Sequence, residues 1–352
     1  MDDDGNFYFG SHSGNFYSLS ASGDIRWVFS TRTKIYGSPV LADGQVIFAG
    51  GDGFLYALSL PHGSIEWVCD LKKGYSGSRS QKLVQAAMHL PFTWNRKRLM
   101  NMDTKCWASV NHAAGQLFIT AFGKGLHVFD TAGNELWSYD LGFPRYQLAG
   151  VVLDETNDLY LPSRNGRIYR FTPGGKQVWK RKVLPGWHAW GSPTYNPDSG
   201  LIQFVFSIGE SKGVVLAVDK TGQEQWRTKL KGAIHGSVAV SADSQALYCA
   251  DFAGYIHMLE AQSGRIIRQV RLSRALRALW TTPTVDAEGS VYISTKDSFA
   301  DGRVVKLDRN LEVLWEYPTA KALSVPLLLA NGDICFGAWD GYYYRLSTDR
   351  ST

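Results

Sequence analysis

Two histidines and one aspartate are the residues whose types fit proton-transfer chemistry. His188 and His235 each stand just ahead of a short segment expected to form a strand, and Asp251 lies in a glycine turn after another strand. Because histidine titrates near neutral pH, either histidine is a candidate general base, and Asp251 is a candidate to orient it. Such a site would suit cyclase, lyase or isomerase chemistry on a largely apolar substrate. The alternative is that both histidines are hydrogen-bonded packing residues.

Aromatic side chains and a few cations accompany these candidates in the same segments. Aromatic walls provide apolar area for burial, and sparse charged groups such as Arg164 or Lys296 could hold an anionic part of a ligand. The predicted substrate-binding residues are Tyr36, Trp107, Trp190, Trp280, Arg164, Lys296 and Trp339. The alternative is that the aromatic side chains only plug a channel.

The four cysteines show no spacing typical of a metal site, so no metal is expected. Cys249 and Cys335 lie inside strand-like segments and are predicted to be small core residues. Cys69 and Cys106 flank a long insertion and could approach each other, but nothing in the sequence requires a disulfide.

A recurring phrase shows which elements position these residues. Trp27, Trp67, Trp137, Trp179 and Trp226 each follow a glycine turn, and they are 40, 42 or 47 residues apart with one double step of 70. A period of this length is typical of propellers. Short alternating segments separated by glycine turns precede each tryptophan, which predicts antiparallel strands.

Counting the central glycine turns predicts eight blades. The turns lie near Gly14, Gly53, Gly125, Gly166, Gly213, Gly254, Gly302 and Gly341. Segments such as Gly37-Ser38-Pro39 and Gly191-Ser192-Pro193 are expected to open the innermost strands, because proline favours the start of a strand. The first unit lacks an inner strand, the last lacks an outer one, and Arg268 replaces the expected tryptophan of the sixth blade. The prediction is an all-β, eight-bladed propeller of four-stranded antiparallel blades, with residues 1–352 as one domain.

The repeated phrases resemble those of the quinoprotein alcohol dehydrogenase-like propellers, a PQQ-repeat superfamily that includes BamB-like proteins. The resemblance covers nearly the whole chain, and it implies that each outer-strand tryptophan packs against a glycine of the next blade. PQQ dehydrogenases of the superfamily are longer and carry a vicinal cysteine pair and a calcium site, neither of which is visible in this sequence. No cofactor is therefore expected, and the chain is not predicted to be a PQQ dehydrogenase.

The joint between the second and third blades carries a long insertion, residues 74–107. A short helix is predicted from Gln81 to Leu90, because Leu83, Val84, Ala87 and Leu90 share one helical face. One hypothesis makes this insertion a lid over the aromatic residues. The other makes it a cover for the outer edge of the propeller or a contact with a protein partner.

Composition limits the possible partners and the expected location of the protein. The net charge of +5 is mild and spread over the blades, so a nucleic-acid surface is not expected. No signal peptide, lipid-attachment cysteine or membrane-spanning run is visible, which favours a cytoplasmic protein, although a trimmed exported protein would look the same.

The functional prediction is a propeller that binds a small molecule at its channel mouth, with cofactor-independent catalysis as an extension. The alternative is a non-enzymatic protein-interaction scaffold or ligand-sensing propeller.

Overall fold

The computed structural model describes residues 1–31, 33–71, 75–76, 110–121, 125–141, 149–275, 279–320 and 324–347. They form two compact units: unit 1 comprises Met1–Val151 with Phe171–Lys176, and unit 2 comprises Val152–Arg170 with Gln177–Thr352. The predicted helix from Gln81 to Leu90 and the predicted site residue Trp107 lie outside the described residues.

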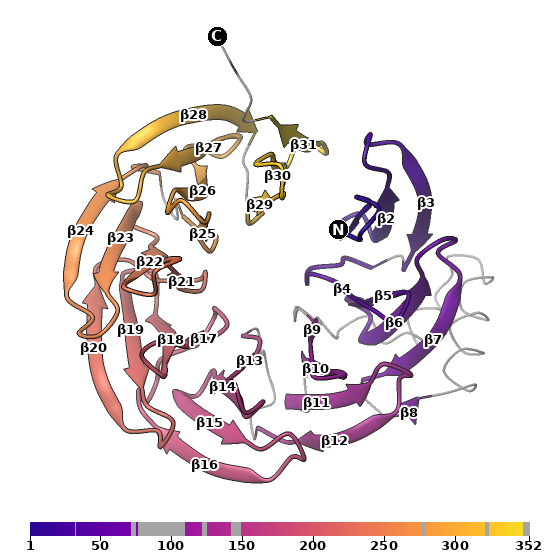
Figure 1. Cartoon of the computed structure of the whole chain (residues 1–352), viewed down its shortest axis with the longest axis horizontal. Helices are drawn as coiled ribbons and strands as arrows, with labels where there is room; N and C mark the ends of the chain where they lie inside the picture. Colours follow the sequence, from indigo (N-terminus) through magenta and orange to yellow (C-terminus); the bar gives the residue numbers. More distant parts are fainter. Residues whose placement is uncertain are drawn as a thin grey trace. The chain divides into compact units, whose positions relative to one another are not determined.

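The described strands form eight antiparallel sheets, numbered here as blades 1–8 in chain order and labelled by strand in Figure 1. Blades 1 to 3 consist of β1 (Phe7–Gly10), β2 (Asn15–Leu19) and β3 (Ile25–Ser30); β4 (Val40–Ala42), β5 (Gln45–Ala49), β6 (Phe54–Ser59), β7 (Ile65–Asp70) and β8 (Tyr75–Ser76); β9 (Val110–Ala113), β10 (Gln116–Ala121), β11 (Gly125–Asp130) and β12 (Glu135–Tyr139). Blades 4 and 5 consist of β13 (Val152–Leu153), β14 (Leu159–Ser163), β15 (Arg167–Phe171) and β16 (Gln177–Lys182); β17 (Thr194–Asn196), β18 (Leu201–Ile208), β19 (Lys212–Val218) and β20 (Glu224–Leu230). Blades 6 to 8 consist of β21 (Ala239–Val240), β22 (Ala246–Ala250), β23 (Tyr255–Glu260) and β24 (Ile266–Arg271); β25 (Thr284–Val285), β26 (Val291–Lys296), β27 (Asp301–Leu307) and β28 (Val313–Ala320); β29 (Leu327–Leu328), β30 (Ile334–Gly337) and β31 (Tyr343–Leu346).

This organisation confirms an all-β, eight-bladed propeller. Blades 1 and 8 have three described strands each, as the sequence predicted. The inner strands begin one residue after the predicted prolines, at Val40 after Pro39 and at Thr194 after Pro193. Blade 2 differs from the expectation, because Tyr75–Ser76 at the start of the insertion pairs with Cys69 and Asp70 as a fifth strand.

The joints between blades explain why tryptophan recurs. The buried indole of Trp226 donates a hydrogen bond to the Ala261 carbonyl at 3.2 Å and lies on Gly264, where a Cβ would come within 2.2 Å of the ring. Gly264 also has a φ of +68°, so side chains are excluded there both by space and by backbone conformation. The same pairing joins Trp27 to Gly63, Trp67 to Gly133, Trp137 to Gly175 and Trp179 to Gly222. This confirms the packing implied by the family resemblance.

The joint between blades 6 and 7 differs from the others on both sides. Arg268 stands where the tryptophan is expected, and it forms an ion pair with Glu312 of blade 7. The residue four positions before the blade 7 tryptophan, a glycine at the joints of the preceding blades, is Leu311. Leu311 has a φ of +64° and a fully buried side chain, which packs in the core cluster that joins blades 6 and 7. A buried leucine thus supplies apolar packing at the joint that lacks an indole.

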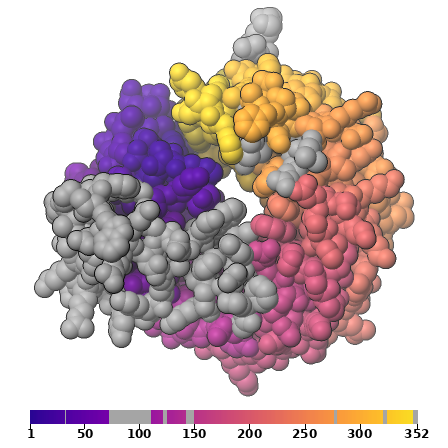
Figure 2. Space-filling model, turned by 180° about the vertical axis from the view of Figure 1, so that it is seen from behind, coloured from indigo at the N-terminus to yellow at the C-terminus, as the bar shows by residue number. Residues whose placement is uncertain are grey.

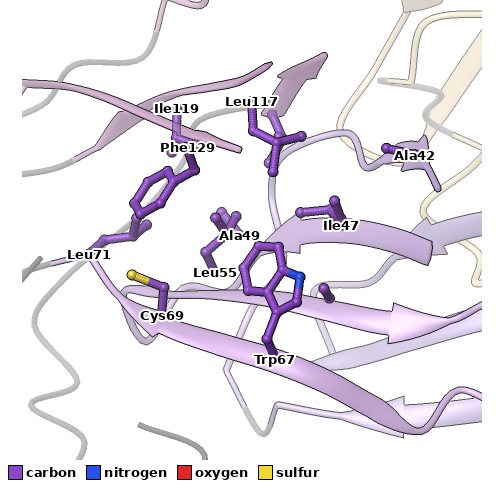
Figure 3. Packing of buried hydrophobic residues seen from close by; sticks show 12 residues of the cluster. Ala42, Ile47, Ala49, Leu55, Trp67, Cys69, Leu71, Leu117, Ile119 and Phe129 are labelled. Atoms are coloured by element: carbon purple, nitrogen blue, oxygen red, sulfur yellow. The ribbon is translucent and has the colours of Figure 1, made fainter. Parts of the chain in front are cut away.

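The cores between blades differ in composition: the core between blades 1 and 2 is rich in aromatic rings such as Phe16 and Phe48, whereas the core between blades 2 and 3 contains more aliphatic residues. Figure 3 shows the core between blades 2 and 3, where Trp67 lies beside Leu55 and Ile47, and Phe129 comes from β11. Cys69 is a buried free thiol in this core. Cys249 and Cys335 are buried as well, which confirms them as core residues, whereas Cys106 lies outside the described residues.

Candidate functional site

Unit 2 brings three predicted site residues into one aromatic stack. The ring of His235 stacks on Trp190 at a centroid distance of 4.2 Å and an interplanar angle of 16°, and its edge meets Trp280 at 5.1 Å. Phe252 completes the stack, with its ring 4.2 Å from His235 and 5.0 Å from Trp280. The guanidinium carbon of Arg164 lies 4.7 Å from the Trp190 ring centroid, within the range of a cation–π interaction. We call Arg164, Trp190, His235, Phe252 and Trp280 the arginine–aromatic cluster.

The loops that carry this cluster are tied together by hydrogen bonds. His188 exchanges two backbone hydrogen bonds of 2.8 Å with Ser207, and its Nδ1 lies 2.8 Å from the Arg164 carbonyl. Because a carbonyl only accepts, Nδ1 carries the proton in this contact. The Ser207 hydroxyl accepts from the Ile234 amide at 2.8 Å and donates to the Ile234 carbonyl at 2.9 Å, next to His235. His188 therefore anchors the Arg164 turn to β18, and the Ser207 hydroxyl anchors the segment ahead of His235 to the same strand.

Burial and charge hold His235 in its neutral form. Burial lowers its pKa from the ordinary 6.5 to about 4, and the positive charge of Arg164 adds to the effect. Near neutral pH the ring is an uncharged stacking partner, and a base with a pKa of about 4 is poorly matched to proton transfer at that pH.

This pKa predicts a pH-dependent stability. Between pH 6.5 and about 4 the unfolded chain binds a proton at His235 and the folded chain does not, so the free energy of unfolding falls as the pH is lowered through that window. On a scale of about 1.4 kcal/mol per pH unit, the loss is of the order of 3 kcal/mol. His235→Phe keeps an aromatic ring and removes the titration, so urea unfolding curves at pH 7, 6, 5 and 4.5 should show a flatter decline for the variant. Parallel declines for the two proteins would contradict the assignment.

The turn aspartates serve the fold. Asp251 is fully buried, accepts from the Tyr255 amide at 3.1 Å and pairs with His257 Nε2 at 2.9 Å. Asp52 in blade 2 makes the corresponding contacts, to the Phe54 amide at 3.2 Å and the Tyr56 hydroxyl at 2.7 Å. In both turns the aspartate accepts hydrogen bonds from the strand that follows, which closes the turn. Asp251 thus has its carboxylate engaged on β23, and the structure shows it with His257.

Cys249, Asp251 and His257 form a trio that resembles a nucleophile with its base. Cys249 is the cross-strand partner of His257 between β22 and β23. The thiol is fully buried, and burial followed by the charge of Asp251 raises its pKa far above the ordinary value. A buried thiol of raised pKa is a poor nucleophile. We therefore assign this trio to the core of blade 6.

The structure also describes the predicted site residues Tyr36, Lys296 and Trp339. Tyr36 belongs to unit 1, where its ring meets His12 at 4.9 Å. Lys296 ends β26, and its carbonyl accepts from the Ser273 hydroxyl at 3.1 Å. Trp339 follows β30 and is 59% exposed. Phe252 was missed by sequence reasoning, although an aromatic residue inside a polar turn, next to Asp251, was an available signal.

Nothing in the described ranges outlines a metal centre or a membrane span. No group of three or more histidine, cysteine, aspartate or glutamate side chains there is placed to hold a metal ion. Among the same residues, no helix has the length and hydropathy needed to cross a membrane.

Comparison with known proteins places this fold and its repeats in a family. The family model described as outer membrane protein assembly factor BamB matches residues 1–147 and 211–336. The chain belongs to the BamB family. It is 24% identical over 298 residues to BamB of Shewanella oneidensis, covering 81% of this chain and 65% of that protein. It is 25% identical over 194 residues to BamB of Kangiella koreensis, covering 51% of this chain and 47% of that protein. The chain thus spans less than two thirds of the length of these two relatives.

Solved structures agree on the fold. The crystal structure of BamB from Moraxella catarrhalis has a TM-score of 0.71 at 17% identity, covering all of this chain and 94% of the other. A quinohemoprotein alcohol dehydrogenase from Pseudomonas putida HK5 has a TM-score of 0.60 at 14% identity, covering 83% of this chain and 61% of the other. At these identities the likeness concerns the fold alone.

The BamB relationship corrects one expectation and bears on a second. The predicted cytoplasmic location is wrong, because the matching family and both curated relatives are named for outer membrane protein assembly. The relationship also favours the interaction scaffold over the cofactor-independent enzyme as the function of the chain.

Proposed function

We propose that this chain is a non-enzymatic scaffold of the BamB type, which binds a protein partner during outer membrane protein assembly. The arginine–aromatic cluster of unit 2 is the proposed contact. The observation that supports it most is Arg164 stacked over partly exposed Trp190, because arginine and tryptophan are the residue types enriched at binding hot spots.

The chemistry of the cluster argues against the enzymatic alternative. His235 lies between Trp190 and Phe252 with a pKa of about 4, and Asp251 is engaged by His257. His188 donates its Nδ1 proton to a main-chain carbonyl. None of the three predicted catalytic residues is thus paired with another of them. A preorganised aromatic surface with one cation suits protein recognition instead.

The small-molecule hypothesis assigned Trp190 and Trp280, together with Tyr36 and Trp107, to the walls of a pocket. In the structure the His235 ring lies against both indoles, at centroid distances of 4.2 Å from Trp190 and 5.1 Å from Trp280, and the Phe252 ring lies 5.0 Å from that of Trp280. Much of the aromatic area that a ligand would cover is therefore used in contacts within the cluster.

Affinity capture tests the scaffold proposal. The tagged chain, incubated with detergent-solubilised envelopes of its source organism, is expected to retain outer membrane assembly proteins identified by mass spectrometry. Arg164→Ala and Trp190→Ala should each reduce retention about tenfold or more, on the scale of hot-spot residues. Trp339→Ala, which removes an exposed tryptophan outside the cluster, is the matched control and should retain them fully.

Two results would contradict the proposal. One is retention that is the same in all variants, with folding verified by their unfolding curves. The other is native mass spectrometry that shows a co-purifying small molecule released by Trp190→Ala, which would favour the ligand hypothesis.

A further inference from the structure

Three consecutive outer strands of unit 2 carry a cation at the same register position. Counting from the outer-strand tryptophan or its equivalent, the third following residue is Lys182 on β16, Lys229 on β20 and Arg271 on β24. All three side chains are exposed. We call these residues the basic row. The blades that carry it form one stretch of surface, running from magenta to orange in Figure 2.

The same position is not basic in the other blades. It is occupied there by Ser30, Asp70, Asp140 and Pro318. At this one register position, cations are thus confined to blades 4 to 6.

The cations of the row are not neutralised within the described part of the chain. Lys182 and Lys229 have no carboxylate partner among those residues, and Arg271 donates to the Ser273 carbonyl at 3.3 Å and lies 5.4 Å from the Tyr255 ring centroid. Neighbouring Lys180 on β16 adds another cation without a carboxylate partner there, 5.2 Å from the Tyr169 ring centroid. By contrast, Arg227 on β20 is paired with Glu224. Exposed cations at the same register position create a local positive potential along the outer strands of these blades.

We propose that the basic row binds an extended acidic segment of a partner protein. This inference rests on the proposed scaffold function and names the chemistry of a second contact. A row of cations, one from each blade, matches carboxylates spaced along an extended chain. At this register position blades 2 and 3 carry Asp70 and Asp140, which would repel an acidic segment. The row is therefore expected to attract only a segment that lies along blades 4 to 6. Such contacts mainly set association rate and salt dependence.

A labelled peptide tests the row directly. The probe is a fluorescein-labelled twelve-residue peptide of alternating glutamate and serine, and its binding to the full chain is measured by fluorescence anisotropy at low salt. The triple variant Lys182→Glu, Lys229→Glu, Arg271→Glu should bind about tenfold more weakly or worse, on the scale of several exposed ion pairs reversed in sign. The matched control Lys34→Glu, Lys176→Glu, Lys212→Glu has the same net charge and also changes three exposed lysines, and it should bind like the wild type. Binding of the wild type should weaken steeply between low and physiological salt.

The outcomes are distinct. Equal losses in both triple variants would mean that net charge alone attracts the peptide, and this would overturn the proposal. No peptide binding, together with tight binding to vesicles of anionic phosphatidylglycerol that the first triple variant loses, would assign the row to a membrane surface and also overturn it. Arg164→Ala should leave peptide binding unchanged, so failure of the row and failure of the arginine–aromatic cluster are told apart.

Discussion

Replacing Trp226 with alanine is expected to lower the free energy of unfolding by about 3–5 kcal/mol, the range for removing a buried tryptophan. Its indole is 8% exposed, covers Gly264 and donates to the Ala261 carbonyl. The substitution leaves a cavity at the joint between blades 5 and 6 and an unpaired carbonyl beside it. Equilibrium urea unfolding followed by circular dichroism measures the effect.

Arg268→Ala is the matched control, because it changes the equivalent position of the next blade. Arg268 forms an ion pair with Glu312, and the two side chains are 41% and 63% exposed. Exposed pairs of this kind contribute about 0–1 kcal/mol, so this variant should unfold almost like the wild type. Similar losses for the two variants would show that the indole is not what secures the joint.

The second large effect is expected at Gly166, in the turn that presents Arg164. Gly166 has a φ of +72°, and a Cβ there would lie 1.8 Å from the Leu184 carbonyl oxygen. The same turn accepts amide hydrogen bonds of 2.9 and 3.1 Å from Val183 and Leu184 at the Gly166 carbonyl. Gly166→Ala must therefore displace the backbone, and we expect a loss of about 3 kcal/mol or more from strain and overpacking together.

Gly186→Ala separates the two causes in this second prediction. Gly186 has a φ of +80°, but a Cβ there would meet no atom within 4 Å. In this control variant only the left-handed backbone conformation lowers the free energy of unfolding, by about 1–2 kcal/mol. Equal midpoints of thermal unfolding for the two alanine variants would show that the Leu184 contact is unimportant. Because Gly166 supports the Arg164 turn, its alanine variant should also lose partner retention, whereas the Gly186 variant should keep it.

The fold was largely predictable because its determinants are local and repeated. A tryptophan four residues after a glycine recurs in successive repeats, and each joint pairs the tryptophan of one repeat with the glycine of the next. Glycine turns and alternating strands then set blade number and strand order. The fifth strand of blade 2 was not predicted, because Tyr75 and Ser76 lie in a segment rich in glycine and serine, without the alternation that marks a strand.

Part of the arginine–aromatic cluster was predictable from the sequence, but its internal contacts were not. Trp190, His235 and Trp280 come together because they share one register in consecutive blades. The sequence could not show that Phe252 and Arg164 would cover His235 and Trp190, nor that His257 would engage Asp251. Those contacts depend on side-chain directions in turns, and these decide whether a histidine is a base or a stacked ring. The basic row was visible in the sequence once the tryptophan register was applied to the residues that follow it.

The altered joint between blades 6 and 7 has a consequence for how such chains diverge. Returning Arg268 to tryptophan would bring an indole to a turn whose left-handed position is filled by Leu311, and returning Leu311 to glycine would empty part of a core that has no indole to fill it. Each reversion alone is thus expected to be worse than both together. Homologous chains should therefore change these two positions in concert, and grafting blade 6 from a relative should succeed only when the first turn of its blade 7 is transferred as well.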